Sequence, residues 1–207
     1  MARTRLTTAR LLGLDRSGPP PPETLAGQPL HPWTVPNAIG ITRLLLLPVF
    51  LVIALNSGDG RVTSAAIIYA VVAGTDYLDG MAARILNQYS RLGTLLDPLT
   101  DRALVVSGVI VCWKFELLPR WALAILAARE LVMVALTRVA MRVGLEFRVR
   151  MLGRWAVWPT MASLFLTMCT ETWVAEAMLY LGICLSIGAT IQYLQDGWRH
   201  VRPSSSG

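Results

Sequence analysis

The sequence predicts an all-α, polytopic membrane protein with six transmembrane helices and a short amphipathic segment before them. Hydrophobic residues make up 54% of the 207 residues, and the mean hydropathy is +0.52. A soluble domain of this length does not have so many long apolar runs. Six runs are each about long enough to cross the ~30 Å hydrocarbon core of a bilayer. The predicted spans are 35–55, 62–86, 93–113, 118–142, 153–172 and 174–196.

These runs divide the chain into an arm at 1–34, a six-helix transmembrane domain at 35–199 and a tail at 200–207. Within the arm, Arg5–Leu14 can form a short helix at the membrane surface, with leucines on its apolar side. A disordered arm is the alternative, because Pro19–Pro22 breaks any helix and favours extended polyproline geometry.

Positive charge is concentrated in alternate connections between the predicted spans. Arginines cluster in the arm, at 84–91, at 142–154 and after 198, whereas the other connections have few. By the positive-inside rule, we expect a multi-pass protein of the plasma membrane with both termini in the cytoplasm. The net charge of +6 suits loops that face anionic membrane lipids. We expect no nucleic-acid partner.

Four aspartates, Asp76, Asp79, Asp97 and Asp101, lie where the second span ends and the third begins. The first two are three residues apart and the last two are four apart, so each pair shares a helix face. A short loop joins the two spans. Both pairs are therefore expected at the same, cytoplasmic, end of the helix bundle.

Burying these carboxylates in a membrane has a large energetic cost. One uncompensated aspartate in a membrane helix costs roughly 2.5–3.5 kcal/mol. Four would cost about 10 kcal/mol, which is comparable to the whole stability of a domain. Carboxylates converging from two helices suit hard divalent cations. Two such ions about 4 Å apart would clamp a phosphoryl group during an in-line displacement.

Small and basic residues beside the aspartates fit phosphate chemistry. Gly80 follows Asp79, and Gly93 lies one turn before Asp97. Glycine lets a neighbouring helix or a substrate approach the backbone closely. Arg84 lies five residues after Asp79 and can reach a phosphate.

Other interpretations of the aspartates stay open. Asp76 and Asp79 alone are also consistent with a solvated helix end. A cation or proton transporter also uses intramembrane carboxylates, but a proton relay spreads them through the depth of the membrane. Clustering at one end favours chemistry at the membrane surface.

The aspartate segment resembles the complete signature of the CDP-alcohol phosphatidyltransferase family. The matching pattern is Asp76-x-x-Asp79-Gly80-x-x-Ala83-Arg84, eight residues, then Gly93-x-x-x-Asp97-x-x-x-Asp101. The resemblance covers about residues 33–199 and excludes the arm. It implies six transmembrane helices and a homodimer.

The resemblance also implies a reaction and roles for the signature residues. The four aspartates would hold two Mg²⁺ or Mn²⁺ ions, and Asp101 would also act as general base on the acceptor hydroxyl. The hydroxyl would attack the lipid-side phosphorus of CDP-diacylglycerol, and CMP would leave. The residues implied along CDP and its diphosphate are Gly80, Ala83, Arg84 and Gly93.

The acceptor alcohol has weaker signals. Pro36–Arg43 resembles the PNxxTxxR pattern of the phosphatidylglycerophosphate synthase branch, which adds Asn37 and Arg43 to the residues expected near CDP and the diphosphate. Gly40 replaces the usual hydroxyl residue. Arg43 either neutralises the aspartates or caps the site from the interface.

Four basic residues are candidates for binding the acceptor: Arg129, Arg148, Arg150 and Arg154. Arg129-Glu130 resembles the RE pair of that branch, although an intramembrane ion pair can also be structural. Thr137 replaces a further arginine, and Gly153–Val157 keeps one basic residue of a GKxKT pattern. The other arginines can equally be positive-inside charge.

We therefore expect glycerol 3-phosphate as acceptor, giving phosphatidylglycerophosphate. The partial loss of basic residues leaves phosphatidylglycerol, the cardiolipin synthase reaction, close behind. Inositol phosphate is the third candidate.

Overall fold

The computed structural model describes residues 33–86, 88–143 and 151–201, and within these ranges it leaves a few side chains undescribed. The surface helix predicted within Arg5–Leu14 lies outside the described residues and stays a prediction, as does the division of the chain into arm, transmembrane domain and tail.

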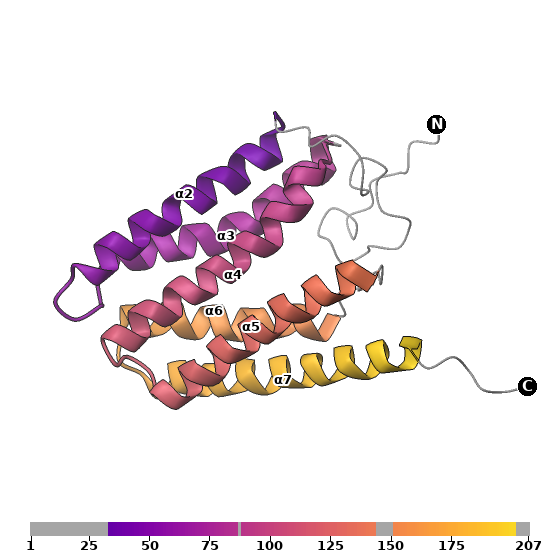
Figure 1. Cartoon of the computed structure of the whole chain (residues 1–207). Coiled ribbons are helices and arrows are strands. Elements are labelled where there is room, and N and C mark those ends of the chain that lie inside the picture. Colours follow the sequence, from indigo (N-terminus) through magenta and orange to yellow (C-terminus); the bar gives the residue numbers. More distant parts are fainter. Residues whose placement is uncertain (1–32, 87, 144–150, 202–207) are drawn as a thin grey trace, which may run out of the picture. The chain divides into compact units, whose positions relative to one another are not determined.

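The described part of the chain is all-helical, as predicted, and contains no strand. Its six helices coincide with the six apolar runs to within a few residues (Figure 1). Their bounds are α2 Val35–Leu55, α3 Thr63–Leu86, α4 Arg91–Lys114, α5 Arg120–Val143, α6 Met151–Cys169 and α7 Trp173–Val201.

Two stretches of the described residues are long and apolar enough to be recognised as membrane spans by length and composition. They are Val35–Leu55, with a mean hydropathy of 2.4, and Trp173–Gln192, with 1.8. Ala156–Cys169 is a shorter apolar stretch. Six spans were predicted, and length and composition identify two of them; the other four stay a prediction.

Prolines inside three helices do not end them. Pro48 lies within α2, Pro98 within α4 and Pro159 within α6. Proline removes one backbone donor, and membrane helices tolerate this because their neighbours satisfy the freed groups. The helices are therefore continuous where a soluble helix would more often break.

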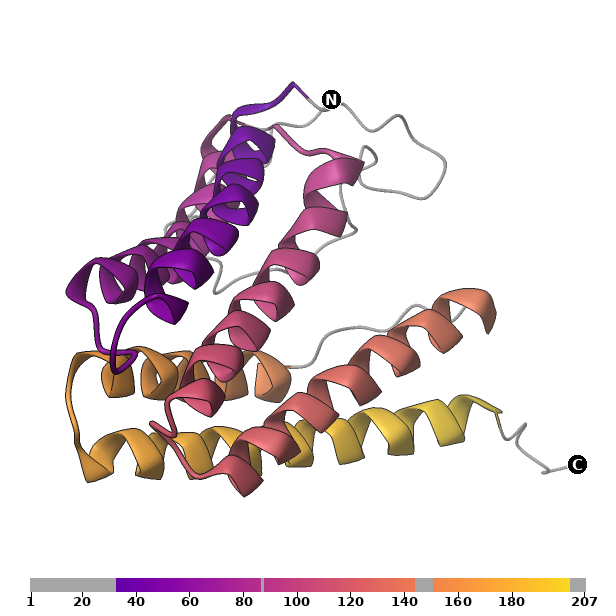
Figure 2. The ribbon, with the colours of Figure 1, turned by 60° about the vertical axis from the view of Figure 1, so that its left-hand side comes forward.

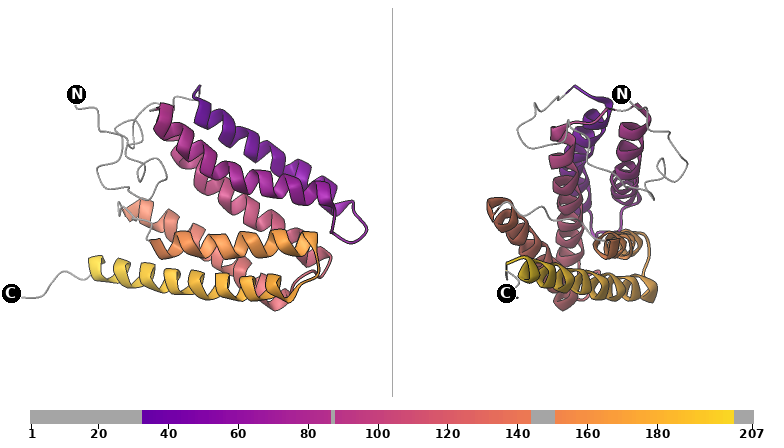
Figure 3. Two further views of the ribbon diagram at one scale, coloured as in Figure 1. Left: turned by 180° about the vertical axis from the view of Figure 1, so that it is seen from behind. Right: turned by 90° about the vertical axis from the view of Figure 1, so that its right-hand side faces the viewer.

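The described residues form two compact units, one from 33–53 and 67–107 and the other from 54–66 and 108–201. In the first unit, α2 packs beside α3 (Figure 3). The Phe50 and Tyr69 rings lie 5.4 Å apart between their centroids. On another side of α2, a Cβ added to Gly40 would lie 3.9 Å from Leu96 of α4. α2 therefore contacts both other helices of this unit.

In the second unit, α6 and α7 form a helical hairpin (Figure 2). Ser163 Oγ donates to the Ala175 carbonyl at 2.6 Å, so a buried hydroxyl joins the two helices. Thr160 of α6 meets Gly182 of α7, where an added Cβ would lie 2.3 Å from the Thr160 Oγ1 and 3.0 Å from its backbone nitrogen. Small residues let helices approach this closely.

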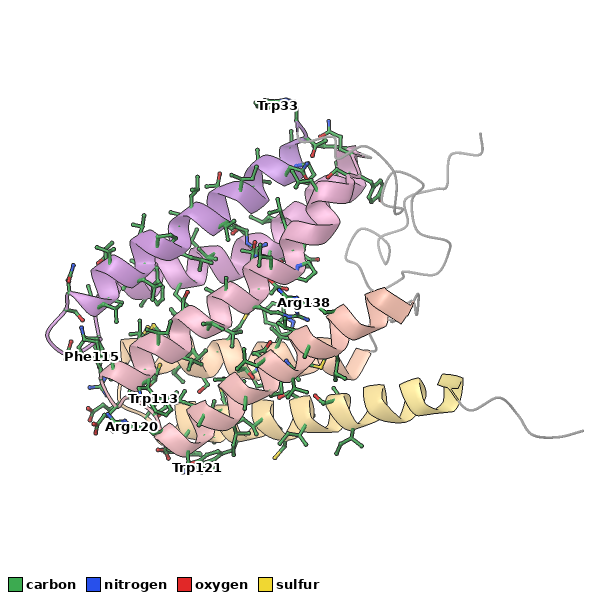
Figure 4. All side chains as sticks on the ribbon, viewed as in Figure 1. Trp33, Trp113, Phe115, Arg120, Trp121 and Arg138 are labelled. Carbon is green, nitrogen blue, oxygen red and sulfur yellow. The ribbon has the colours of Figure 1, made fainter. Side chains whose placement is uncertain are left out.

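One end of the second unit combines aromatic and charged side chains. Trp113, Phe115, Arg120 and Trp121 gather where α4 ends and α5 begins (Figure 4). Lys114 Nζ donates to the Leu55 carbonyl at 2.6 Å. This combination is typical of the boundary between membrane and water.

The helices expose aliphatic side chains and bury hydroxyls. Leu45 and Leu131 are 66% and 72% exposed, whereas Thr100 and Ser163 are fully buried. This distribution is unfavourable in water, where large exposed apolar patches mark contact surfaces, and it suits a lipid environment.

We predict that Gly182→Ala lowers the melting temperature of the purified protein in detergent by several degrees, equivalent to about 1–3 kcal/mol. The new methyl group would clash with the Thr160 backbone, so α6 and α7 must separate. Gly74→Ala is the matched control, since a Cβ there meets nothing within 4 Å. Equal melting temperatures for the two variants would contradict the close packing.

Candidate active site

Arg43 joins the three helices of the first unit through its buried guanidinium. The side chain is only 1% exposed. Its Nε donates to the Val72 carbonyl at 3.0 Å, its Nη1 to Asp76 Oδ1 at 2.9 Å and its Nη2 to Asp101 Oδ1 at 3.3 Å. One guanidinium on α2 therefore holds one carboxylate of α3 and one of α4.

The two carboxylates remain accessible although their arginine partner is not. The Asp76 and Asp101 side chains are 42% and 37% exposed. They also lie close enough to interact with each other. The structure thus brings together one member of each predicted aspartate pair, on a surface that a ligand can reach.

The other two predicted aspartates are described less fully. Asp97 is exposed and lies one helical turn before Asp101 on α4. The backbone of Asp79 belongs to α3, but its side chain is not described. Among the described side chains, no three acidic, histidine or cysteine groups come together as a metal site. The four-aspartate site therefore stays a prediction.

The chemistry of these donors fits a hard divalent cation. Carboxylate oxygens are the ligands that Mg²⁺ and Mn²⁺ prefer. A cationic group, the Arg43 guanidinium, already contacts one oxygen from each of two helices. Asp79 and Asp97 belong to the same two helices, so their carboxylates are candidates for further oxygen ligands.

A second polar contact links the start of α4 to α2, and it includes a residue that the sequence analysis missed. Ser90 Oγ accepts from the Gly93 amide at 3.0 Å, so Ser90 is the N-cap of α4. The same hydroxyl donates to Asn37 Oδ1 at 2.7 Å. A serine directly before an apolar helix is a recognisable sequence signal for this role. Asn37, the α2 residue that accepts from Ser90, has no sequence signal for this contact.

Gly93 lies close against this contact, with little space for a side chain. A Cβ added there would lie 3.0 Å from Asn37 Oδ1 and 3.3 Å from Ser90 Oγ. Asn37 and Ser90 are both buried, 1% and 7% exposed. The glycine thus allows α2 to approach α4, which is one of the two roles expected for it. A contact of Asn37 or Gly93 with CDP stays a prediction.

The other residues predicted to bind CDP or the acceptor are described only in part. Gly80 and Ala83 are partly buried on α3, and the Arg84 side chain is not described. Arg148 and Arg150 lie outside the described residues. Arg154 belongs to α6, without a described side chain.

Arg129 and Glu130 form a nearly buried ion pair on α5, in the second unit. Their side chains are 14% and 11% exposed, and Arg129 Nη1 donates to Glu130 Oε1. The buried Arg129 Nε has no hydrogen-bond partner among the described residues. The two charges neutralise each other in part, as a structural role requires, and the binding of an acceptor by Arg129 stays a prediction.

Comparison with known proteins agrees with the signature. Residues 33–188 match the CDP-alcohol phosphatidyltransferase family. A Bacillus subtilis protein named CDP-diacylglycerol--glycerol-3-phosphate 3-phosphatidyltransferase is 28% identical, covering 84% of this chain and 100% of its own. A Pseudomonas fluorescens protein of the same name is 28% identical over 81% of this chain and 92% of its own.

A Streptomyces coelicolor protein named cardiolipin synthase (CMP-forming) is 32% identical, covering 81% of each chain. The family match extends over most of the chain and includes every helix of both units at least in part. On these grounds the chain belongs to the CDP-alcohol phosphatidyltransferase family.

Proposed function

We propose that this chain transfers the phosphatidyl group of CDP-diacylglycerol to a glycerol-type acceptor, with glycerol 3-phosphate as first choice, and releases CMP. Family membership makes it a transferase of phospholipid biosynthesis. The observation that supports the proposed site best is the pairing of Asp76 and Asp101 through Arg43, since it joins the two halves of the family signature.

In the proposed site, Asp76, Asp79, Asp97 and Asp101 hold two divalent ions, Mg²⁺ or Mn²⁺. The family is generally dependent on divalent metals. When bound, such ions neutralise the diphosphate and stabilise the charge on the departing phosphate. Gly80, Ala83 and Gly93 are small residues that would let CDP approach the helix backbones, and Arg84 would contact the diphosphate through its charge.

Asp101 takes the proton of the acceptor hydroxyl as general base. The hydroxyl oxygen then forms a bond to the lipid-side phosphorus, the bond from that phosphorus to the bridging oxygen breaks, and CMP leaves with the electron pair. Arg43 donates from Nη2 to Asp101 at 3.3 Å and from Nη1 to Asp76 at 2.9 Å. These contacts would hold Asp101 in position to receive the proton.

We propose that all six helices cross the plasma membrane, with both termini and the aspartates on the cytoplasmic side. The shortest helix has 19 residues and the longest 29, so at 1.5 Å per residue even the shortest spans roughly 28 Å. The exposed aliphatic faces and the tryptophans at one end of the second unit support this topology. The family resemblance leads us to propose a homodimer.

The acceptor proposal rests on Arg129, which has a buried Nε without a described partner. With Arg148, Arg150 and Arg154 it would bind the acceptor's phosphate. Relatives named for glycerol 3-phosphate transfer and for cardiolipin synthesis are both similar to this chain. Phosphatidylglycerol therefore remains the second candidate, and inositol phosphate the third.

We expect purified protein to release CMP from CDP-diacylglycerol only with Mg²⁺ or Mn²⁺ and with one of the three acceptors, offered separately. Glycerol 3-phosphate is expected to give the highest turnover, measured as CMP by chromatography. EDTA is expected to abolish release. Release with phosphatidylglycerol alone would reassign the reaction to cardiolipin synthesis. A cation or proton transporter would release no CMP with any acceptor.

Asp101→Asn is expected to lower kcat by about 100-fold or more, because an amide cannot accept the acceptor's proton. The melting temperature should change little, since the asparagine oxygen can still accept from Arg43. Asp59→Asn is the control, because Asp59 is an exposed loop carboxylate that accepts from the Arg61 amide. Full turnover in Asp101→Asn would remove the general-base assignment.

Arg129→Met is expected to raise KM for glycerol 3-phosphate about tenfold or more while KM for CDP-diacylglycerol stays the same. A charge-assisted hydrogen bond to the acceptor's phosphate would be lost. Arg138→Met, on an exposed arginine of the same helix, is the control. A lower melting temperature with both KM values unchanged would show that the Arg129–Glu130 pair is structural only.

A further inference from the structure

We infer that Arg43 is a permanent internal cation of the active site. It holds Asp76 and Asp101 together before metal binds, and its charge lowers the affinity of the site for metal. It is thus a positioning residue and not a ligand of CDP. This inference deepens the proposed function, since it concerns the metal site proposed there. It rests on the described contacts of Arg43 with Asp76 and Asp101.

The geometry of Arg43 leaves its guanidinium directed at protein groups. The side chain is 1% exposed, and its Nε, Nη1 and Nη2 each donate to a different partner. A diphosphate would have to displace Asp76 or Asp101 to reach either terminal nitrogen. The carboxylates, at 42% and 37% exposed, form the accessible side of the cluster.

The Val72 carbonyl anchors the guanidinium one helical turn before Asp76. This oxygen accepts from Arg43 Nε at 3.0 Å and also from Thr75 Oγ1 at 3.2 Å. The fork of the arginine is therefore fixed relative to α3, and its other two nitrogens set the separation of the two carboxylates. Lysine has no equivalent fork, because its ammonium is a single point charge.

The charge of Arg43 acts in two opposite directions. Without metal, it offsets the repulsion between the Asp76 and Asp101 carboxylates, which it contacts from α2. With metal, the same fixed charge lies beside the divalent ion and opposes its binding. A guanidinium does not lose its proton in proteins, so this opposition cannot be relieved by deprotonation.

The test compares full-length wild type with Arg43→Met, which removes the charge but keeps much of the stem, and Arg43→Lys, which keeps the charge. Free Mn²⁺ is titrated by electron paramagnetic resonance, and melting temperatures are measured in EDTA and in Mn²⁺. Arg43→Met is expected to melt several degrees lower in EDTA and to bind Mn²⁺ about tenfold more tightly. Arg43→Lys is expected to bind Mn²⁺ with nearly wild-type affinity.

A second variant separates charge repulsion from lost packing. Arg43→Met combined with Asp76→Asn removes one of the two repelling charges, so its melting temperature in EDTA should recover part of the loss. If Arg43→Met is unfolded in EDTA, folding on addition of Mn²⁺ would support the inference, and failure to fold with Mn²⁺ would overturn it. Unchanged or weaker Mn²⁺ affinity in a folded Arg43→Met would also overturn it.

The proposed function is tested separately in the same preparations by CMP release from wild type. Tighter Mn²⁺ binding in Arg43→Met without wild-type turnover would retain the role of Arg43 and reject the reaction. Wild-type turnover with unchanged Mn²⁺ affinity in Arg43→Met would retain the reaction and reject the role of Arg43.

Discussion

Charge neutralisation inside an apolar helix bundle is the constraint on which the first unit depends. Asp76 and Asp101 belong to helices whose outer faces are aliphatic, so their charges need a partner within the unit. Arg43 is that partner, and it is supplied by α2, whose mean hydropathy of 2.4 is the higher of the two recognisable spans. An apolar helix thus determines where the acidic residues of its two neighbours meet.

The same helix contributes a second inward polar residue at its other contact with α4. Asn37 accepts from Ser90, the N-cap of α4, while Arg43 lies nearly two turns further along α2. These two buried side chains fix α4 at its first turn and again at Asp101. Contacts from α2 therefore contribute to the position of Asp101 relative to Asp76, in addition to the short connection between α3 and α4.

The sequence predicted the helices because they depend on local patterns, and the structure brings together one aspartate of each predicted pair, Asp76 and Asp101. Apolar runs locate the helices, and spacings of three and four residues place Asp76 with Asp79 and Asp97 with Asp101. Ser90 was missed although it has a capping signal, because its importance comes from Asn37, a residue distant in sequence. Arg43 was expected either to neutralise the aspartates or to cap the site, and its contacts with Asp76 and Asp101 agree with the first alternative. The sequence could not decide between the two, since no local pattern specifies which helix face meets which. Of the four arginines expected to bind the acceptor, Arg148 and Arg150 lie outside the described residues, and the side chain of Arg154 is not described.

The proposed metal cluster gives Arg43 a further consequence for substrate binding. Four carboxylates and two divalent ions would together be neutral, and a neutral cluster attracts a diphosphate only weakly. The Arg43 charge makes the assembled cluster cationic by one unit, without occupying a position that the diphosphate needs, because the guanidinium is buried behind Asp76 and Asp101. Before metal binds, the Arg43 charge only reduces the net negative charge of the four carboxylates. An anionic donor would then be repelled until the ions are in place, so the carboxylates favour binding of metal before substrate, and the Arg43 charge would contribute to substrate binding only once the ions are bound.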